Sequence, residues 1–394
     1  MLDETSARGV RAVVARFGKD LDDVLTSSIK FVPQEVPLDQ LGLNDVLVAV
    51  RATEIVWTDT VMATGQYQHQ PKVPYAPGMT YSGVVVAAGQ AVLQHGNVRL
   101  GDRIAVASSN AGPRSSGRYQ PYGGCASYAI APVSAIRRVP PSWNDDQAAS
   151  FAYGYDTAYH ALVMCGAVAP GQTILIHGAS GGVGLPAVHL ARALGLRVYC
   201  TTRSTAKAEA LRALGVENVF LVADSTGAPR SFFKEVQAAC GIARGVDIVY
   251  DGVGGDQLAI ESIRSLRFGG KLLIVGWAST PNVAAGGGDR TKPARPNVVP
   301  TNLLMMKGIH AIGCPAMIAT RFDKALEPKR SAALEKLLLS GALPPPLVAK
   351  SLPLLDLGEA LRIKAASGTA MGAVIVRPPR LHSANFSMAL VSKL

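Results

Sequence analysis

The sequence predicts an α/β protein of two domains, one barrel-like and antiparallel, the other built on a parallel sheet. Three observations carry this prediction. The chain has 394 residues, 48% hydrophobic and 17% charged, which is enough for two hydrophobic cores. Up to about Asp145, short apolar runs alternate with Gly, Pro and Asp turns, a pattern typical of antiparallel strands. Beyond Asp145, helical periodicity alternates with apolar strands, as in a parallel sheet.

Turns and short strands define the first predicted domain. Residues 1–9 look like a loose terminus, 54–60 are helix-like, and the polar, Gly/Pro/Ser-rich stretch 108–124 is a predicted loop. Strands, two of them with the turns that precede them, are expected over 11–16, 45–52, 77–86, 101–106 and 125–131. Many short strands separated by turns indicate a barrel-like domain.

The second predicted domain is organised around one strand–helix–strand unit. Thr173–His177 is apolar and rich in β-branched residues, which suits a buried parallel strand. Apolar residues then recur at helical spacing over 183–194, and Gly195 ends the helix as a C-cap. Residues 196–202 form the next apolar strand. This succession is the βαβ unit of a dinucleotide-binding sheet.

The glycine-rich turn inside this unit has a chemical explanation. Backbone N–H groups must approach a pyrophosphate closely, and the helix N-terminus adds a partial positive charge. A side chain at Gly181 would block the phosphate, and one at Gly184 would push the helix off the strand. The predicted phosphate-binding residues are Ser180, Gly181, Gly182, Val183 and Gly184. The alternative is a glycine-rich αβ loop that binds no ligand.

Later strands of the second domain end in small residues. Strands are expected over 246–250, 271–275 and 309–313. Because open α/β sheets bind ligands at the carboxyl ends of their strands, further cofactor contacts are expected at Val253, Gly276 and Trp277. The remaining chain is expected to form a disordered surface loop at 279–300, a helix at 331–340, a stiff connector at 344–346 and a terminal strand at 373–377.

The residues after the second strand of the βαβ unit indicate which dinucleotide binds. NAD-selective sites place an acid about 20 residues beyond the glycines, to bond the ribose 2′-hydroxyl. Here the strand ends in Thr202, Arg203 and Ser204, with Lys207 following, and no acid is present. Hydroxyl groups and two cations suit a 2′-phosphate. The sequence therefore predicts NADPH; the alternative is an exposed Arg and Lys at a helix start.

Cysteine usage and charge restrict the function classes. The five cysteines are scattered and form no Cys-x-x-Cys pair, which argues for a reducing compartment and against a disulfide framework. The net charge is +11, but no Lys/Arg run is dense enough to predict nucleic-acid binding. No segment looks like a signal peptide or is long enough to span a bilayer, so no membrane association is predicted.

Several short motifs together resemble a known family. The chain resembles the medium-chain dehydrogenase/reductase superfamily in its zinc-free quinone oxidoreductase branch, including the quinone oxidoreductase-like proteins, over about residues 10–378. The matching motifs are 65–68, 74–79, 82–85, 101–103, 157–162, 170–171, the glycine-rich turn and 302–304.

The resemblance implies the domain organisation. A GroES-like, β-barrel-type catalytic domain would comprise 1–148 and 319–380, and a Rossmann NADPH-binding domain 149–318. Residues 381–394 would form a flexible tail. The resemblance also implies a homodimer joined through the Rossmann sheet edge near 309–313.

Zinc ligands are missing where zinc-dependent relatives carry them. The three ligand positions fall on Val56, Met79 and near Tyr153, none of which holds zinc at its usual geometry. The region of the structural zinc site offers only Cys125. No metal is therefore expected.

The resemblance also names candidate catalytic residues. Without a metal, the proton donor must be a side chain or water. Tyr67 matches a tyrosine that faces the nicotinamide in related reductases, and Thr157 matches a threonine that positions it. Each has a plainer alternative, a tyrosine packed at a domain edge and a helix-start hydroxyl. Asp156 is an unusual acid that either alters acceptor preference or caps a helix.

The expected function is an NADPH-dependent, zinc-independent reductase of quinones or α,β-unsaturated carbonyls, which are its small-molecule partners. A 2-enoyl thioester (enoyl-CoA) reductase is the alternative within enzymes, and an NADPH-binding protein with little turnover is the alternative outside them. Ser392-Lys393-Leu394 reads as a peroxisomal address, recognised by an import receptor in peroxisomes or glycosomes. If that ending is coincidental, a cytoplasmic location is expected.

Overall fold

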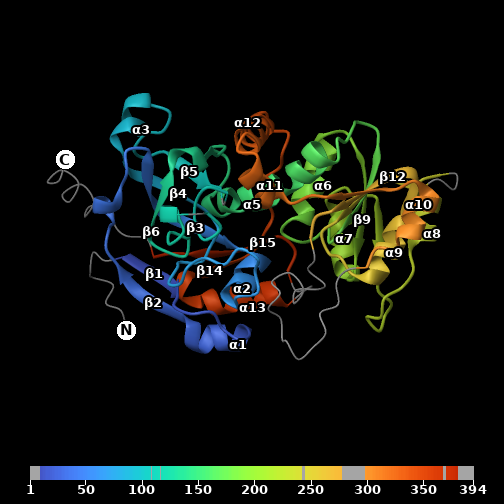
Figure 1. Cartoon of the computed structure of the whole chain (residues 1–394), viewed down its shortest axis with the longest axis horizontal. Helices are drawn as coiled ribbons and strands as arrows, with labels where there is room; N and C mark the ends of the chain where they lie inside the picture. The colour runs from blue at the N-terminus through green and yellow to red at the C-terminus, as the bar shows by residue number, and fades with distance from the viewer. Residues whose placement is uncertain are drawn as a thin grey trace. The chain divides into compact units, whose positions relative to one another are not determined.

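The computed structural model (Figure 1) describes residues 9–107, 109–115, 117–241, 245–276, 298–366 and 370–379. Contacts among these residues divide them into two compact units. The first, the barrel unit, holds the described residues up to 152 and those within 348–367 and 373–394. The second, the sheet unit, holds the described residues within 153–347 and 368–372. Each unit has its own sheet.

The main sheet of the barrel unit is built around one long central strand, β3 (Asp45–Ile55). Its other strands are β4 (Thr80–Ala88), β5 (Arg103–Val106), β6 (Tyr128–Pro132), β7 (Ile136–Arg138), β14 (Val348–Pro353) and β15 (Ala373–Arg377). The order is β14-β15-β3-β4-β5-β7, with β6 also paired to β3. A separate antiparallel pair joins β1 (Gly9–Val14) and β2 (Ile29–Gln34). Val46, Val48 and Val50 of β3 lie buried together with Tyr81 and Val85 of β4.

The end of the described chain completes this sheet. β15 runs antiparallel to β3, with Val374 opposite Ile55, and β14 runs parallel to β15. A barrel-type domain assembled from early and late parts of the sequence is the GroES-like architecture implied by the resemblance, and this expectation is confirmed.

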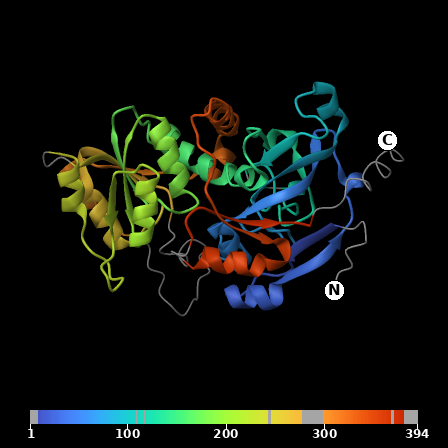
Figure 2. The same ribbon diagram turned by 180° about the vertical axis from the view of Figure 1, so that it is seen from behind.

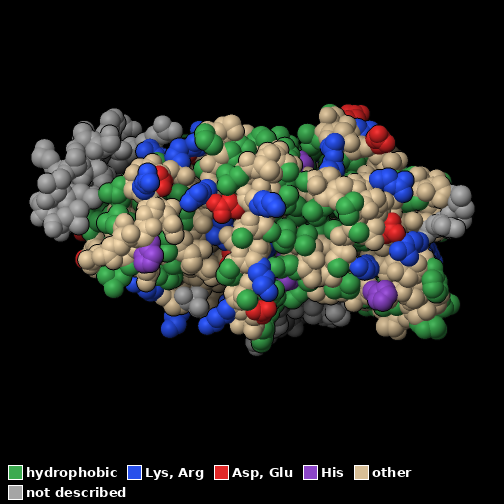
Figure 3. Space-filling model, turned by 90° about the horizontal axis from the view of Figure 1, so that it is seen from above, with side chains coloured by type: hydrophobic (Ala, Val, Ile, Leu, Met, Phe, Trp, Pro, Cys, Tyr) green, Lys and Arg blue, Asp and Glu red, His purple; other side chains and the backbone are tan. Residues whose placement is uncertain are grey.

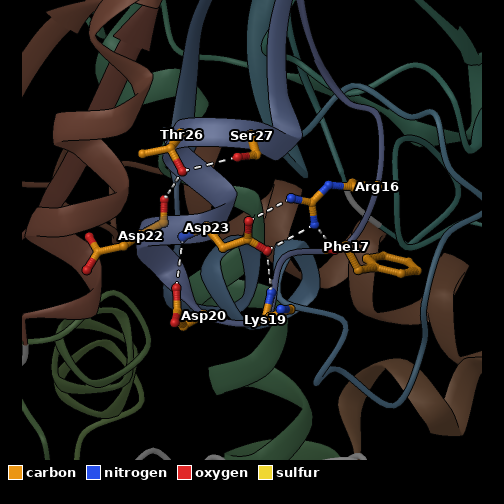
Figure 4. Close-up of polar contacts among 8 residues, drawn as sticks. All are labelled: Arg16, Phe17, Lys19, Asp20, Asp22, Asp23, Thr26 and Ser27. Carbon is orange, nitrogen blue, oxygen red and sulfur yellow. Dashed lines mark hydrogen bonds and ion pairs between the residues drawn. The ribbon is translucent and has the colours of Figure 1, made fainter.

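The helices of the barrel unit are short. They are α1 (Leu21–Asp23), α2 (Trp57–Ala63), α3 (Gln90–His95), α4 (Asp145–Ala149) and α13 (Leu357–Ala365). Figure 4 shows the polar contacts that fix α1. Asp20 Oδ1 accepts the N–H of Asp23 at 2.8 Å, as an N-cap does. The Asp23 carboxylate binds both terminal nitrogens of Arg16, at 2.9 and 2.6 Å, and this lowers the pKa of Asp23 to about 2.

The sheet unit contains a six-stranded parallel sheet with helices on both faces (Figure 2). Its strands are β8 (Thr173–His177), β9 (Arg197–Thr202), β10 (Asn218–Leu221), β11 (Val246–Asp251), β12 (Leu266–Ile274) and β13 (His310–Gly313). The order is β10-β9-β8-β11-β12-β13. From β8 the chain adds β9 and β10 on one side of the sheet and then adds β11, β12 and β13 on the other side. This reversal of strand order between β8 and β11 is the position where open α/β sheets bind ligands. This arrangement confirms the predicted Rossmann-type fold.

The helices of the sheet unit follow its strands. They are α6 (Gly184–Ala193), α7 (Thr205–Ala213), α8 (Phe233–Ala239), α9 (Asp256–Ser265), α10 (Thr301–Lys307), α11 (Ala316–Phe322) and α12 (Leu326–Leu339). α5 (Ala152–Tyr159) leads into this unit and continues as η5 (His160–Cys165).

Some element boundaries differ from the predicted ones. Strand β3 continues to Ile55, so the helix expected over 54–60 begins only at Trp57. Asp59 Oδ2 accepts the N–H of Val56 at 2.9 Å, and this contact sets the helix start. Strand β12 begins at Leu266 rather than 271, because the chain pairs with β11 at Val246 before a register shift.

The chain returns to the barrel unit later than the predicted residue 319. The chain rejoins the barrel unit at Val348. The physical reason is α12, because its buried Arg330 pairs with Asp156 on α5 and ties this segment to the sheet unit. Trp277, residues 279–297 and Ser392-Lys393-Leu394 lie outside the described residues, so the predictions made for them stay predictions.

Candidate cofactor and active-site residues

The glycine-rich turn joins β8 to α6 and is closed by backbone hydrogen bonds. The N–H of Gly181 donates to the carbonyl of Gly178 at 2.9 Å, and Gly178 has a φ of +65°. A Cβ on Gly184 would lie 2.1 Å from Gly178 O, so only glycine lets α6 start this close to β8. A Cβ on Gly181 would meet nothing nearer than 3.3 Å. The turn therefore fits a dinucleotide, since it presents glycine backbone at a helix N-terminus, and the one atom close to a Cβ on Gly181 would be Gly178 O.

The carboxyl ends of β11 and β12 lie next to this turn. Asp251 Oδ1 accepts the N–H groups of Val253 at 2.9 Å and Gly254 at 2.8 Å, which curls the chain after β11. A Cβ on Gly178 would come within 2.9 Å of the Val253 side chain. A Cβ on Gly276 would lie 2.6 Å from Gly252 O. The structure thus gathers Val253 and Gly276 with the turn, at the reversal point of the sheet.

Two hydroxyls and two cations follow the end of β9. Ser204 caps α7, because its Oγ accepts the N–H of Lys207 at 3.4 Å. Thr202 Oγ1 accepts the N–H of Ser204 at 3.3 Å. Arg203 is exposed, and Lys207 Nζ donates to the carbonyl of Ala370 at 2.8 Å. To bind a 2′-phosphate, the Lys207 ammonium group would have to give up this hydrogen bond to the Ala370 carbonyl.

Thr157 and Asp156 sit within α5. Thr157 Oγ1 donates to the carbonyl of Tyr153 at 3.0 Å, as a hydroxyl inside a helix commonly does. The helix begins at Ala152, so the alternative that Asp156 is an N-cap is wrong. Asp156 Oδ1 instead lies 3.5 Å from Nε of Arg330, which is fully buried and also pairs with Glu327. Asp156 is one partner in a buried ion-pair cluster, which the sequence pattern did not indicate.

Tyr67 lies in the barrel unit, just after α2. It is 4% exposed, and the guanidinium carbon of Arg114 is 5.6 Å from its ring centroid. The ring of His69 meets it edge-on, at 5.8 Å. Sequence reasoning missed Arg114, because it belongs to a loop with no helical or strand period.

A second group missed by sequence reasoning consists of buried ionisable side chains near the end of β3. Glu54 and Asp59 are each 2% exposed, and Lys364 of α13 acts electrostatically on both. Burial raises the pKa of Glu54 to about 8 and that of Asp59 to about 6. The pKa of Lys364 is lowered by burial. An acid directly before apolar Ile55 and Val56, just after a predicted strand, was the available signal.

Apolar residues occupy two positions where zinc-dependent relatives place ligands. Val56 is 2% exposed and Met79 fully buried, both in the barrel unit. The N–H of Gly78 donates to Asp59 Oδ1 at 3.1 Å, so this acid is engaged by backbone. No group of three or more His, Cys, Asp or Glu side chains in the described residues could hold a metal ion. Tyr153, at the third position, lies in the sheet unit.

Two surface properties bear on partners. On the face seen in Figure 3, Lys and Arg side chains are dispersed rather than gathered into a stripe. Among the described residues, no helix is both long and apolar enough to cross a membrane.

A GroES-like unit and a Rossmann unit with a glycine-rich turn together define a two-domain oxidoreductase that binds a nicotinamide cofactor. Residues 42–141 match the family model described as alcohol dehydrogenase GroES-like domain, and residues 182–327 match zinc-binding dehydrogenase. The chain belongs to the medium-chain dehydrogenase/reductase superfamily, in its quinone oxidoreductase branch. This confirms the resemblance seen in the sequence.

Individual relatives agree with this assignment. Quinone oxidoreductase-like protein 2 of Mus musculus is 31% identical over 281 residues, 71% of this chain and 70% of the mouse protein. Quinone oxidoreductase of Homo sapiens is 29% identical over 237 residues, 60% of this chain and 66% of the human protein. The structure of mycobacterial Rv1454c complexed with NADPH is 26% identical, with a TM-score of 0.72, over 94% of this chain and 100% of that one.

Proposed function

We propose that the protein is an NADPH-dependent reductase of quinones or α,β-unsaturated carbonyls that works without zinc. The observation that carries the cofactor choice is the end of β9, where Arg203 and Lys207 stand beside hydroxyl residues and no acid is present. The NADPH bound in the mycobacterial relative supports the same choice.

The chain's own residues have distinct tasks in this proposal. Backbone N–H groups of the turn after β8 bind the pyrophosphate, and Arg203 and Lys207 bind the 2′-phosphate. When bound, the cofactor supplies a hydride. Thr157 orients the nicotinamide, and Tyr67 donates a proton to the reduced acceptor, as the family resemblance implies. Apolar Val56 and Met79 support proton donation by a side chain rather than activation by zinc.

The activity is tested by NADPH oxidation with a panel of quinones, enones and enoyl-CoA thioesters. We expect turnover with a quinone or an enone, and general-acid catalysis predicts a loss of about 100-fold or more in Tyr67→Phe. Thr157→Val should also lose most of the activity. Turnover confined to enoyl-CoA would favour the enoyl thioester reductase. Tight NADPH binding with no turnover on any acceptor would show a binding protein and sink the enzyme proposal.

Cofactor preference is tested by changing Arg203 and Lys207 to Ala together. Each charged hydrogen bond contributes about 1.5–3 kcal/mol, so NADPH affinity should fall about 100-fold or more while NADH affinity stays nearly constant. Titration of each cofactor by fluorescence measures this. Arg197→Ala, at the opposite end of β9, is the matched control and should change neither affinity. Equal losses for both cofactors would contradict the 2′-phosphate assignment.

A further inference from the structure

Arg114 places a permanent positive charge against a buried tyrosine ring. Its guanidinium carbon lies 5.6 Å from the Tyr67 ring centroid, within the range of a cation–π contact. Tyr67 is only 4% exposed, so little water separates the ring from its surroundings. In such an environment a fixed charge acts more strongly than it does in solvent.

The same guanidinium also acts electrostatically on a buried acid. Arg114 favours the ionised form of Asp59, against the larger opposing effect of burial. Asp59 is itself held by the N–H groups of Val56 and Gly78, at 2.9 and 3.1 Å. Arg114 therefore acts both on an acid fixed to the backbone and on the Tyr67 ring.

We propose that Arg114 is a positioning residue for proton donation, one that orients Tyr67 and stabilises the phenolate formed when Tyr67 gives up its proton. This inference rests on the proposed function. Once the substrate has accepted a hydride and become an anion, the O–H bond of Tyr67 breaks and its proton bonds to the substrate. Negative charge then develops on the phenol oxygen and is shared with the aromatic ring, and the guanidinium, 5.6 Å from the ring centroid, lowers the energy of that state. A proton from water restores the phenol afterwards.

The barrel unit offers a matched control for this contact. The guanidinium carbon of Arg118 lies 5.5 Å from the ring centroid of Tyr119, nearly the same geometry on a tyrosine with no proposed role in the reaction. Arg114→Met and Arg118→Met each remove a cation–π contact, and only the first removes charge from beside Tyr67. Arg114→Lys keeps the charge but loses the planar guanidinium.

The experiment measures kcat, KM for NADPH and the solvent deuterium isotope effect, with NADPH and a trans-2-alkenal as the probe substrate. For Arg114→Met we expect kcat to fall about 10- to 100-fold, KM for NADPH to change little and the isotope effect to rise, because proton transfer becomes slower than hydride transfer. Arg114→Lys should recover part of kcat. Arg118→Met should keep kcat and the isotope effect of the unchanged protein.

A folded Arg114→Met that keeps full kcat, or loses it with an unchanged isotope effect, overturns the inference. If Arg114→Met does not fold, the same two criteria apply to Arg114→Gln, which also removes the charge. Tyr67→Phe in the same assay separates the two proposals. Full activity in that variant removes the proposed proton donor, whereas lost activity there together with an unaffected Arg114→Met rejects the role of Arg114 alone.

Discussion

At the scale of single residues, the two glycines of the cofactor turn have different tasks. Gly184 is required by the protein itself, because its Cβ would stand 2.1 Å from the Gly178 carbonyl oxygen. A Cβ on Gly181 would meet the same carbonyl oxygen less closely, at 3.3 Å. Its lack of a side chain leaves room for a ligand. The same motif thus serves helix–strand packing at one position and access to the cofactor at another.

The buried carboxyl group of Glu54 should make the free energy of unfolding depend on pH. Its pKa is raised by burial from 4.5 to about 8, so its contribution to stability is complete below about pH 4.5 and is lost as the pH rises through 8. Glu54→Gln cannot ionise. We therefore expect the free energy of unfolding of Glu54→Gln, relative to the unchanged protein, to increase between pH 5 and 8, with a slope of at most about 1.4 kcal/mol per pH unit.

Chemical denaturation across this pH range measures the effect. Glu359→Gln on α13 is the control, because Glu359 is exposed and pairs only with the surface residue Lys350 among the contacts seen. Its difference from the unchanged protein should be flat over the same range. A flat difference for Glu54→Gln as well would mean that burial does not suppress ionisation at this site.

At the scale of elements, a carboxylate from one helix caps the start of another. Glu261 of α9 accepts the N–H groups of Phe232 at 2.8 Å and Phe233 at 3.0 Å, at the beginning of α8. The first N–H groups of a helix have no partner inside it, and Phe232, at the N-cap, has no side chain that could serve. Glu261 is 4% exposed, so this cap also holds α8 against α9.

Glu261→Gln should therefore destabilise the protein by about 1–3 kcal/mol, since it weakens hydrogen bonds to a charged acceptor. The free energy of unfolding from chemical denaturation tests this. Glu235→Gln, on the exposed side of α8, should stay within about 0.5 kcal/mol of the unchanged protein. Equal small losses in both variants would show that the cap contributes nothing specific.

At the scale of the whole molecule, we propose a homodimer through the edge of the six-stranded sheet. β13 is the edge strand after β12, and nearby apolar side chains are unusually exposed, with Phe268 at 74%, Met305 at 74% and Met306 at 57%. Light scattering should give twice the mass of one chain. Met305→Glu with Met306→Glu should shift the mass toward one chain, whereas Phe322→Glu, on α11 and 87% exposed, should not. A single-chain mass for the unchanged protein would refute the dimer.

Much of the sheet unit was predictable because its signals are local. The β8–α6–β9 unit and its glycine turn follow from hydrophobic period and from residues adjacent in sequence, and the structure has them where expected. Boundaries were less predictable where one side chain decides them. The hydrogen bond between Asp59 and Val56 makes α2 begin at Trp57 rather than at the predicted residue 54. Pairing of Leu266 with Val246 makes β12 begin before the predicted residue 271.

The β8–α6–β9 unit, its cofactor turn and the cap of α7 at Ser204 could be predicted from the sequence, because each is encoded by neighbouring residues. The two-domain oxidoreductase class followed from the resemblance of several short motifs to the family. Contacts between distant side chains became known only from the three-dimensional fold. It paired Arg114 with Tyr67, Asp156 with Arg330, and Lys207 with the carbonyl of Ala370. Such contacts depend on packing between segments far apart in the chain, and no local period specifies them.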